Sequence, residues 1–485
     1  MKFMKLLNVS TGISVALCCC VSAMAQSENK EISDMMLPLD KTIRIPLPDK
    51  VNPHLLKQKA LYKPKPATAH DSSQADDEVE FGWDTAKWDT SRMVSTDNIA
   101  LFWAPGFGDN ITTAPDLIEV TESGDTISHN MKVDLANLLQ KLEHFYKFFY
   151  NDLGFVKAGT KADDYKMMVM LDYSLEGTAF GGDYDGQIGA LWIAPNRVQD
   201  ENLNCIAHEL GHSFQMQISC DGEGEGWGGA GFYEMASQWM LWQVNPDWQK
   251  DENYHLQAFS DLTHKAFLHI DNIYHSPYVI ELWGEKHGRP FIAELFRNGE
   301  VGEDPVMTYK KLKGVSQKEF NDEMFGNYTR LVNWDIDRVR ENTRGYTDIW
   351  HTKLMDAGNG WQRIAPENCP ENYGFNVIPI EVPEPGKKVT VEFRGEAGKK
   401  GYFTKNKDMA GWRYGFVGID AAGKEIYGEM EDKSKGKVIF VNPENNPVQK
   451  LWLVVMGAPT QHWRNIDGPQ NPGDAQWPYA IKVKL

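Results

Sequence analysis

The chain has little cysteine, no surplus of positive charge and, beyond its first 25 residues, no long apolar run. A formal net charge of −18 argues against nucleic acid as a partner, because phosphate binding needs a basic face. The later sequence has no apolar stretch near the roughly 18 residues that a bilayer requires, so we expect no membrane span. Internal repeats and a glycine-rich phosphate loop are also lacking.

The residues that are present indicate a globular, exported protein of two or three domains. A length of 485 residues is long for one domain, and 41% hydrophobic residues with 12% aromatics suffice for packed cores. Lys2 and Lys5 precede an apolar stretch at 9–21, and an Ala-Met-Ala tripeptide ending at Ala25 offers a cleavage site. We therefore expect a signal peptide at 1–25 and a periplasmic, cell-surface or extracellular protein.

Three cysteines, Cys205, Cys220 and Cys369, follow the signal peptide. On one continuous helix Cys205 and Cys220 would lie roughly 22 Å apart, too far for a disulfide. A bridge would therefore need Cys369, and three buried free thiols are the alternative. The cysteines at 18–20 lack the preceding small residue of a usual lipid-attachment site.

The stretch that says most about chemistry is HELGH, from His208 to His212. Residues four apart on a helix share a face, with Cβ atoms about 5 to 6 Å apart, so both histidines can bind one metal ion, usually zinc. Glu209 is rotated roughly 100° from His208, which suits a general base acting on a metal-bound water. Apolar residues at helical spacing predict a buried stripe beside the histidines: Leu203, Ile206, Ala207, Leu210, Phe214 and Ile218.

Glu234 is the candidate third metal ligand. It lies 22 positions after His212, in GFYEMASQWMLW, whose apolar residues predict a second amphipathic helix. A catalytic zinc takes three protein ligands and leaves one position for water, so two histidines and this glutamate would complete the set. A solvated helix residue is the alternative interpretation of Glu234.

HELGH, a glycine-rich connection and a Glu on the next helix resemble the gluzincin branch of the zincin metallopeptidases. HELGHSFQ is also similar to the HExGH signature of enhancin-like, mucin-targeting peptidases. From about residue 95 onward the chain resembles an uncharacterised family of secreted bacterial proteins with an HExGH helix. The resemblance implies an α+β fold in which a zincin-like catalytic domain, a small mixed sheet with helices, carries the active-site helix.

We expect four segments along the chain: a signal peptide at 1–25, a Pro-rich lead-in or pro-segment at 26–90, a zincin-like metallohydrolase domain at 91–365 and a β-sandwich at 366–485. Within the catalytic domain, apolar patterning predicts strands at 98–103, 165–171 and 189–194 and a helix at 134–153. From Glu234 to about residue 345 the pattern is mainly helical.

The strand expected at 189–194 directly precedes the HELGH helix. By its position it resembles the edge strand with which zincins align an extended substrate, and an internal strand is the alternative. FGGDYDGQ at 180–187 lacks most of a calcium loop and indicates a tight turn. The loop at 221–231 holds six glycines, which suits a cleft floor or lid as well as a plain connection.

Tyr274 and His275 are the candidate oxyanion-stabilising residues, with Tyr278 third. Gluzincins place a Tyr or His where it donates a hydrogen bond to the tetrahedral intermediate, and IYHSPYVIELWGEKHG resembles such a segment. Packed or surface aromatic residues are the alternative.

After residue 366 short alternating apolar runs are separated by Gly, Pro and Asn turns, which predicts the β-sandwich. Its tryptophans at 412, 452, 463 and 477 suit either sugar stacking or interior packing. The whole sequence therefore predicts an exported zinc-dependent metallopeptidase acting on proteins or glycoproteins, with candidate glycan contact through the sandwich. The alternative is a glycan- or protein-binding surface protein with a non-catalytic zinc site.

Overall fold

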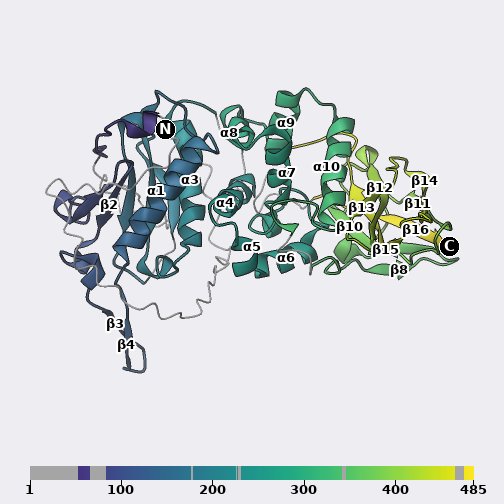
Figure 1. Ribbon diagram of the computed structural model, residues 1–485, viewed down its shortest axis with the longest axis horizontal. Helices are drawn as coiled ribbons and strands as arrows, with labels where there is room; N and C mark the ends of the chain where they lie inside the picture. The colour runs from purple at the N-terminus through teal and green to yellow at the C-terminus, as the bar shows by residue number, and fades with distance from the viewer. Residues whose placement is uncertain are drawn as a thin grey trace. The chain divides into compact units, whose positions relative to one another are not determined.

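The computed structural model in Figure 1 describes residues 53–65, 83–175, 179–224, 227, 231–340, 346–464 and 474–485. The fold is mixed α+β with several sheets, which confirms the expected class. The expected signal peptide lies outside the described residues. Two compact units divide the chain: unit 1 comprises Met1–Glu225, Met240–Pro246 and Arg289–Arg297, and unit 2 comprises Gly226–Trp239, Asp247–Gly288 and Asn298–Leu485.

This division differs from the domain border expected at residue 366. Most helices after residue 247 belong to unit 2, together with the C-terminal strands. Helix α4 (Gly231–Val244) is itself divided, because its residues through Trp239 belong to unit 2 and those from Met240 belong to unit 1. The lead-in expected at 26–90 is not separate from the first unit, since its residues 53–65 and 83–90 belong to unit 1.

Unit 1 is built on a five-stranded mixed sheet in the order β1-β2-β5-β7-β6. Strands β2, β5 and β7 run parallel, whereas β1 and β6 pair antiparallel at the two edges. Every residue of β2, β5 and β7 is buried, as is typical of parallel strands. The strands are β1 (Met93–Ser95), β2 (Ile99–Trp103), β5 (Met167–Leu171), β6 (Phe180–Tyr184) and β7 (Ile188–Ile193).

Two long helices, α1 (Leu135–Asn151) and α3 (Asn204–Cys220), pack beside this sheet (Figure 1). The Asp134 side chain caps α1 by accepting from the Asn137 amide at 3.0 Å. Phe214 of α3 meets two rings of α1, with centroids 5.1 Å from Tyr146 and 5.4 Å from Phe149. This aromatic seam fixes α3, and unit 1 also contains the shorter helices α2 (Lys161–Asp164) and α8 (Pro290–Arg297).

Residues 53–65, which we name the N-terminal strap, are held against unit 1 by both backbone and side chains. The Ala60 amide donates to Asp164 O at 2.8 Å, and His54 Nδ1 lies 2.8 Å from Asp163 Oδ2. Lys59 is buried, and its ammonium donates to the Tyr146 hydroxyl at 2.8 Å. This part of the expected lead-in is therefore integral to the unit.

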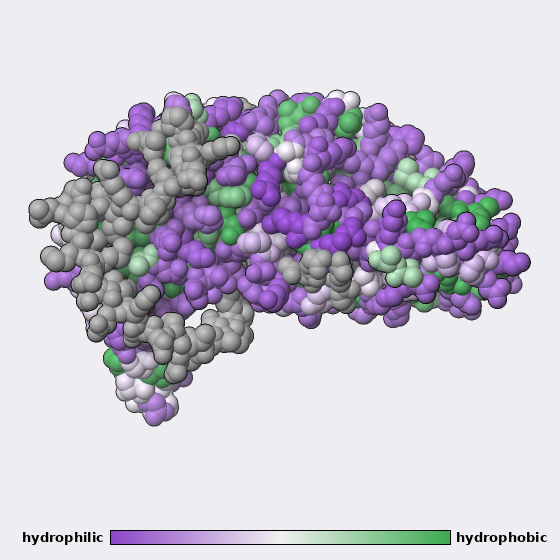
Figure 2. Space-filling view, viewed as in Figure 1, coloured by the Kyte–Doolittle hydropathy of each residue, from purple (hydrophilic) through white to green (hydrophobic). Residues whose placement is uncertain are grey.

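A two-stranded hairpin of β3 (Leu117–Val120) and β4 (Thr126–His129) projects from the body of unit 1 (Figure 1). Ile118, Val120 and Ile127 are 55%, 68% and 44% exposed. The hairpin surface accordingly shows hydrophobic colour among polar residues in Figure 2.

Unit 2 combines helices with two packed sheets. One sheet has the order β10-β15-β12-β13 and the other β14-β11-β16-β9-β8. Aromatic rings fill the core between them, with Phe393 stacked on Tyr414 at 4.0 Å between centroids. The strands are β8 (Leu354–Asp356), β9 (Gln362–Ile364), β10 (Phe375–Pro379), β11 (Lys388–Gly395), β12 (Trp412–Asp420), β13 (Glu425–Tyr427), β14 (Lys435–Val441), β15 (Val448–Gly457) and β16 (Tyr479–Lys484).

The helices of unit 2 include one with a capping box, in which Ser316 and Glu319 bond to each other's backbone amides at the start of α10. Across the described residues, no helix combines the length and apolarity needed to cross a bilayer. The helices are α5 (Trp248–Asp251), α6 (Tyr254–Leu262), α7 (Tyr278–His287), α9 (Pro305–Lys313) and α10 (Gln317–Leu331).

Candidate metal centre

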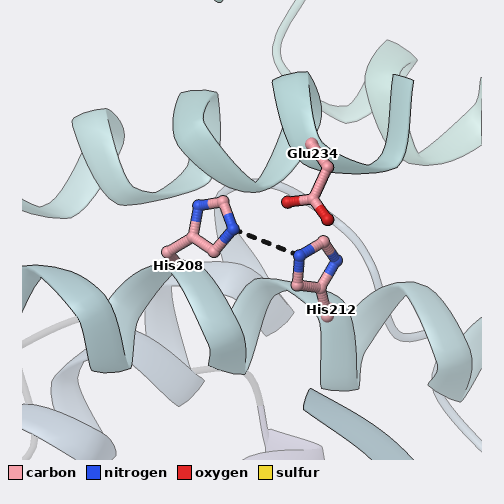
Figure 3. A group of neighbouring side chains, drawn as sticks. All are labelled: His208, His212 and Glu234. Atoms are coloured by element: carbon pink, nitrogen blue, oxygen red, sulfur yellow. Dashed lines mark hydrogen bonds between the residues drawn. The ribbon is translucent and has the colours of Figure 1, made fainter. Parts of the chain in front are cut away.

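Helix α3 places His208 and His212 on one face, as the four-residue spacing predicts. Their Nε2 atoms lie 3.2 Å apart and face each other in Figure 3. His208 is buried and His212 is half-buried. Two imidazole nitrogens that converge in this way suit a shared cation.

The ring orientation of His212 is set by its own helix. Its Nδ1 lies 3.0 Å from Oε1 of Gln215, an amide oxygen that can only accept. The ring proton of neutral His212 therefore belongs on Nδ1, which leaves Nε2 with the lone pair that a metal requires. Sequence reasoning missed Gln215, although its i+3 spacing from His212 was a readable signal.

Glu234 comes from α4, and its carboxylate points toward the two imidazoles in Figure 3. One ligand atom from each of His208, His212 and Glu234 lies within 4.8 Å of the others. Two imidazole nitrogens and a carboxylate oxygen form a donor set that suits zinc. The structure thus brings together the three residues that the sequence nominated.

Glu209 is held by the neighbouring strand β6. The Gly181 amide donates to Glu209 Oε2 at 3.1 Å. A Cβ on Gly181 would stand 1.9 Å from the Glu209 carbonyl oxygen, so only glycine permits this approach of strand and helix. Sequence reasoning missed Gly181, because a glycine in FGGDYDGQ indicates a turn as readily as a close contact.

The edge-strand prediction is wrong in its choice of strand. The segment expected at 189–194 is β7, which lies between β5 and β6 and is therefore internal. The edge is β6, which occupies the first part of the segment expected to be a turn. Asp185, Gly186 and Gln187 form the tight connection between β6 and β7, with Asp185 and Gly186 at positive φ.

Tyr274 and His275 lie against α4 within unit 2. The Tyr274 carbonyl accepts from Gln238 Nε2 at 2.9 Å, one helical turn after Glu234, and the Tyr274 side chain is 38% exposed. His275 Nδ1 lies 2.6 Å from Nδ1 of His255. Burial, followed by the neighbouring His255, lowers the pKa of His275 to about 4. Their catalytic role stays a prediction.

Residues 53–485 match a family described as a family of unknown function, DUF6055. The chain belongs to this family. The match starts at the N-terminal strap and includes both compact units. No curated protein matches the chain.

Solved structures with partial likeness include a glycosylation-associated protein complex (Gap123) from Streptococcus agalactiae, at 9% identity over 27% of this chain, with a TM-score of 0.16. The chain covers 38% of that protein chain. Another is the C-terminal family 22 carbohydrate binding module of Clostridium thermocellum Xyn10B, at 12% identity over 27% of this chain and 78% of the module, with a TM-score of 0.17. These TM-scores are too low to carry an argument about fold or function.

The structure revises the tryptophan interpretation for this DUF6055 member. Trp412, Trp452 and Trp477 are at most 3% exposed, and Trp463 packs in a T-shape against Trp477 at 6.1 Å. Three of the four nominated rings are therefore core residues rather than sugar platforms. Glycan contact through the sandwich stays a prediction without this support. Cys205, Cys220 and Cys369 are free thiols, but only Cys220 and Cys369 are buried, so the alternative of three buried free thiols is confirmed in part.

Proposed function

We propose that this protein is an exported zinc-dependent hydrolase of the metallopeptidase type. The observation that carries the proposal is the convergence of His208, His212 and Glu234 next to Glu209. These three side chains would hold the ion, and the donor set fits zinc because Gln215 fixes His212 with its Nε2 lone pair available. When bound, zinc supplies a Lewis acid that lowers the pKa of water and polarises a carbonyl group.

Glu209 would act as the general base. It follows His208 directly on α3, so its carboxylate is offset by about 100° from the histidine face, beside the ligands and outside their set. The amide of Gly181 orients this carboxylate through Oε2. Glu209 then takes a proton from the attacking water and returns it to the departing amine, which balances the hydrolysis of a peptide bond.

The test compares Glu209→Gln with Glu201→Gln, a matched change at an exposed residue. Glu209→Gln should abolish cleavage of casein and mucin substrates while the zinc bound through His212 is retained, because an amide cannot accept the proton. Glu201→Gln should behave like the wild type. Cleavage that persists in Glu209→Gln, or a wild-type protein that cuts neither substrate with zinc supplied, would overturn the proposal.

A further inference from the structure

A second convergence of metal-ligating side chains lies within unit 2, far along the chain from HELGH. His269 directly precedes the short helix η6 (Ile270–Asn272), Glu371 lies shortly before β10, and Asp474 lies shortly before β16. One ligand atom from each of these three residues lies within 4.8 Å of the others. Three separate segments of the chain therefore supply one nitrogen and two carboxylate groups to a single point.

Both carboxylates are buried, with Glu371 only 6% and Asp474 only 4% exposed. The Lys265 ammonium lies 3.8 Å from Glu371 Oε1 but also 3.5 Å from Asp271 Oδ2, so its charge is shared with a second acid. Two buried carboxylates whose oxygens lie within 4.8 Å of each other repel when both are ionised, and a cation between them would offset that repulsion. Burial raises the pKa of Glu371 to about 7, although Lys265 and the Ala266 amide act in the opposite direction.

The hydrogen bond of His269 sets a condition on its use as a ligand. Its Nδ1 accepts from the Asp271 amide at 3.0 Å, and Oδ2 of Asp271 lies 3.6 Å from the same nitrogen. With Nδ1 turned to Asp271, Nε2 is the ring nitrogen available for the group. Because Nδ1 accepts this bond, neutral His269 carries its proton on Nε2, and ligation through Nε2 requires that proton to leave or to move to Nδ1 with loss of the bond from the Asp271 amide.

We propose that His269, Glu371 and Asp474 form a second metal site, which binds a divalent transition-metal cation such as zinc. Imidazole favours zinc over calcium, and the two carboxylates supply the charge that neutralises it. The proposal is independent of the proposed hydrolase function, since it shares no residue with the HELGH group.

The site would act as a clamp within unit 2. The Ala266 amide donates to Glu371 Oε2 at 2.9 Å, and the Phe267 amide donates to Asn372 O at 3.1 Å. The segment that carries His269 is therefore hydrogen-bonded to the segment that carries Glu371. Trp477 Nε1 donates to Asn372 Oδ1 at 2.9 Å and brings in the segment after Asp474. A cation at the junction would join the helical part of the unit to both sheets of the sandwich.

The experiment measures zinc per chain by elemental analysis after dialysis against excess zinc, on the full-length protein. The wild type should hold about two ions, and His212→Ala, which removes the HELGH site, should hold about one. In the His212→Ala background, the isosteric pair Glu371→Gln and Asp474→Asn should remove the remaining ion, whereas Asp408→Asn at an exposed position should not.

Thermal melting covers the case in which the carboxylate variants fail to fold. Chelated His212→Ala protein should melt at a higher temperature when zinc is added and should respond less to calcium. His269→Gln, whose side chain is 17% exposed, should remove that zinc response while leaving a folded protein. The second site is refuted if the His212→Ala protein binds no zinc, or if the double variant His212→Ala with His269→Gln still binds zinc. Either result is independent of the hydrolase proposal.

Discussion

The two candidate metal-binding groups of this protein are assembled in different ways. His208 and His212 come from one helix and are fixed by its repeat, with Glu234 added from α4. His269, Glu371 and Asp474 come from three segments that are roughly 100 residues apart in sequence and meet only through the packing of unit 2. Local geometry defines the first group, and long-range packing defines the second.

This difference has a functional meaning. The HELGH group carries Glu209, an extra carboxylate held beside the ligands by Gly181, as a hydrolytic site requires. The second group places two buried carboxylates beside one histidine, an arrangement that suits a structural cation. We therefore expect chemistry at the first group and stability from the second.

The largest expected effect is a difference in hydrolytic activity between a variant of the HELGH group and a variant of the second group. His212→Ala should lower the rate of hydrolysis by at least about 10³-fold, which is the usual effect of removing an essential catalytic group. His269→Gln should leave the rate per folded molecule unchanged. Steady-state cleavage of a casein or mucin substrate measures the rates of both variants. Equal losses of rate would contradict the assignment of catalysis to the HELGH group alone.

The next effect concerns pH in the chelated protein. Because the folded pKa of Glu371 is raised to about 7, the folded state binds this proton more tightly than the unfolded state. The stability it contributes is complete below the unfolded pKa and is lost as the pH rises to about 7, amounting to about 3 kcal/mol at most. Urea unfolding at pH 4.5 and pH 7.5 measures the loss.

Glu371→Gln is the control for this pH dependence, since an amide does not titrate. The fall in unfolding free energy between the two pH values should shrink in this variant by the contribution of Glu371. Saturating zinc should also flatten the wild-type profile, because the cation replaces the proton. An unchanged profile in Glu371→Gln would assign the pH dependence to other groups.

Tyr274→Phe tests the catalytic role predicted for this residue. If the hydroxyl stabilises the oxyanion, kcat should fall by about 10²-fold with KM and melting temperature unchanged, since the exposed ring carries little packing. Tyr254→Phe, a second exposed tyrosine, is the control. A kcat within twofold of the wild type would remove Tyr274 from the mechanism.

The smallest effect concerns the support of Glu209. Gly181→Ala should destabilise unit 1 by about 2 kcal/mol, because the added Cβ would meet backbone of α3 that cannot give way. Gly326→Ala, in a helix with open space around its Cβ position, should be neutral or stabilising by up to about 1 kcal/mol. Chemical denaturation compares the two, and equal effects would show that the close approach is unimportant.

Much of unit 1 could be predicted from the sequence because its signals are local. The helix expected at 134–153 is α1 at Leu135–Asn151, and the strand expected at 165–171 is β5 at Met167–Leu171. Both follow from periodic apolar residues that need no knowledge of their partners. The same holds for His208, Glu209 and His212, whose relation is fixed by one helical turn.

The other parts of the fold and of the two candidate sites depend on tertiary contacts that a single sequence does not reveal. Strand β6 was expected to be a turn because glycine is depleted in strands, whereas Gly181 is present so that α3 can approach. The three-residue strands β8 and β9 gave too short a pattern to be recognised. Glu371 and Asp474 carried no spacing signal, since only the tertiary fold brings them to His269.

The N-terminal strap has a consequence for the order of folding. Its contacts link His54 to a residue 109 positions later and Lys65 to one 120 positions later, so they close very long loops. Contacts of such separation pay a large loop-closure entropy and form slowly. We expect the sheet and its helices to assemble first and the strap to dock last, so that unit 1 reaches its final state only when one of the earliest parts of the chain has returned to it.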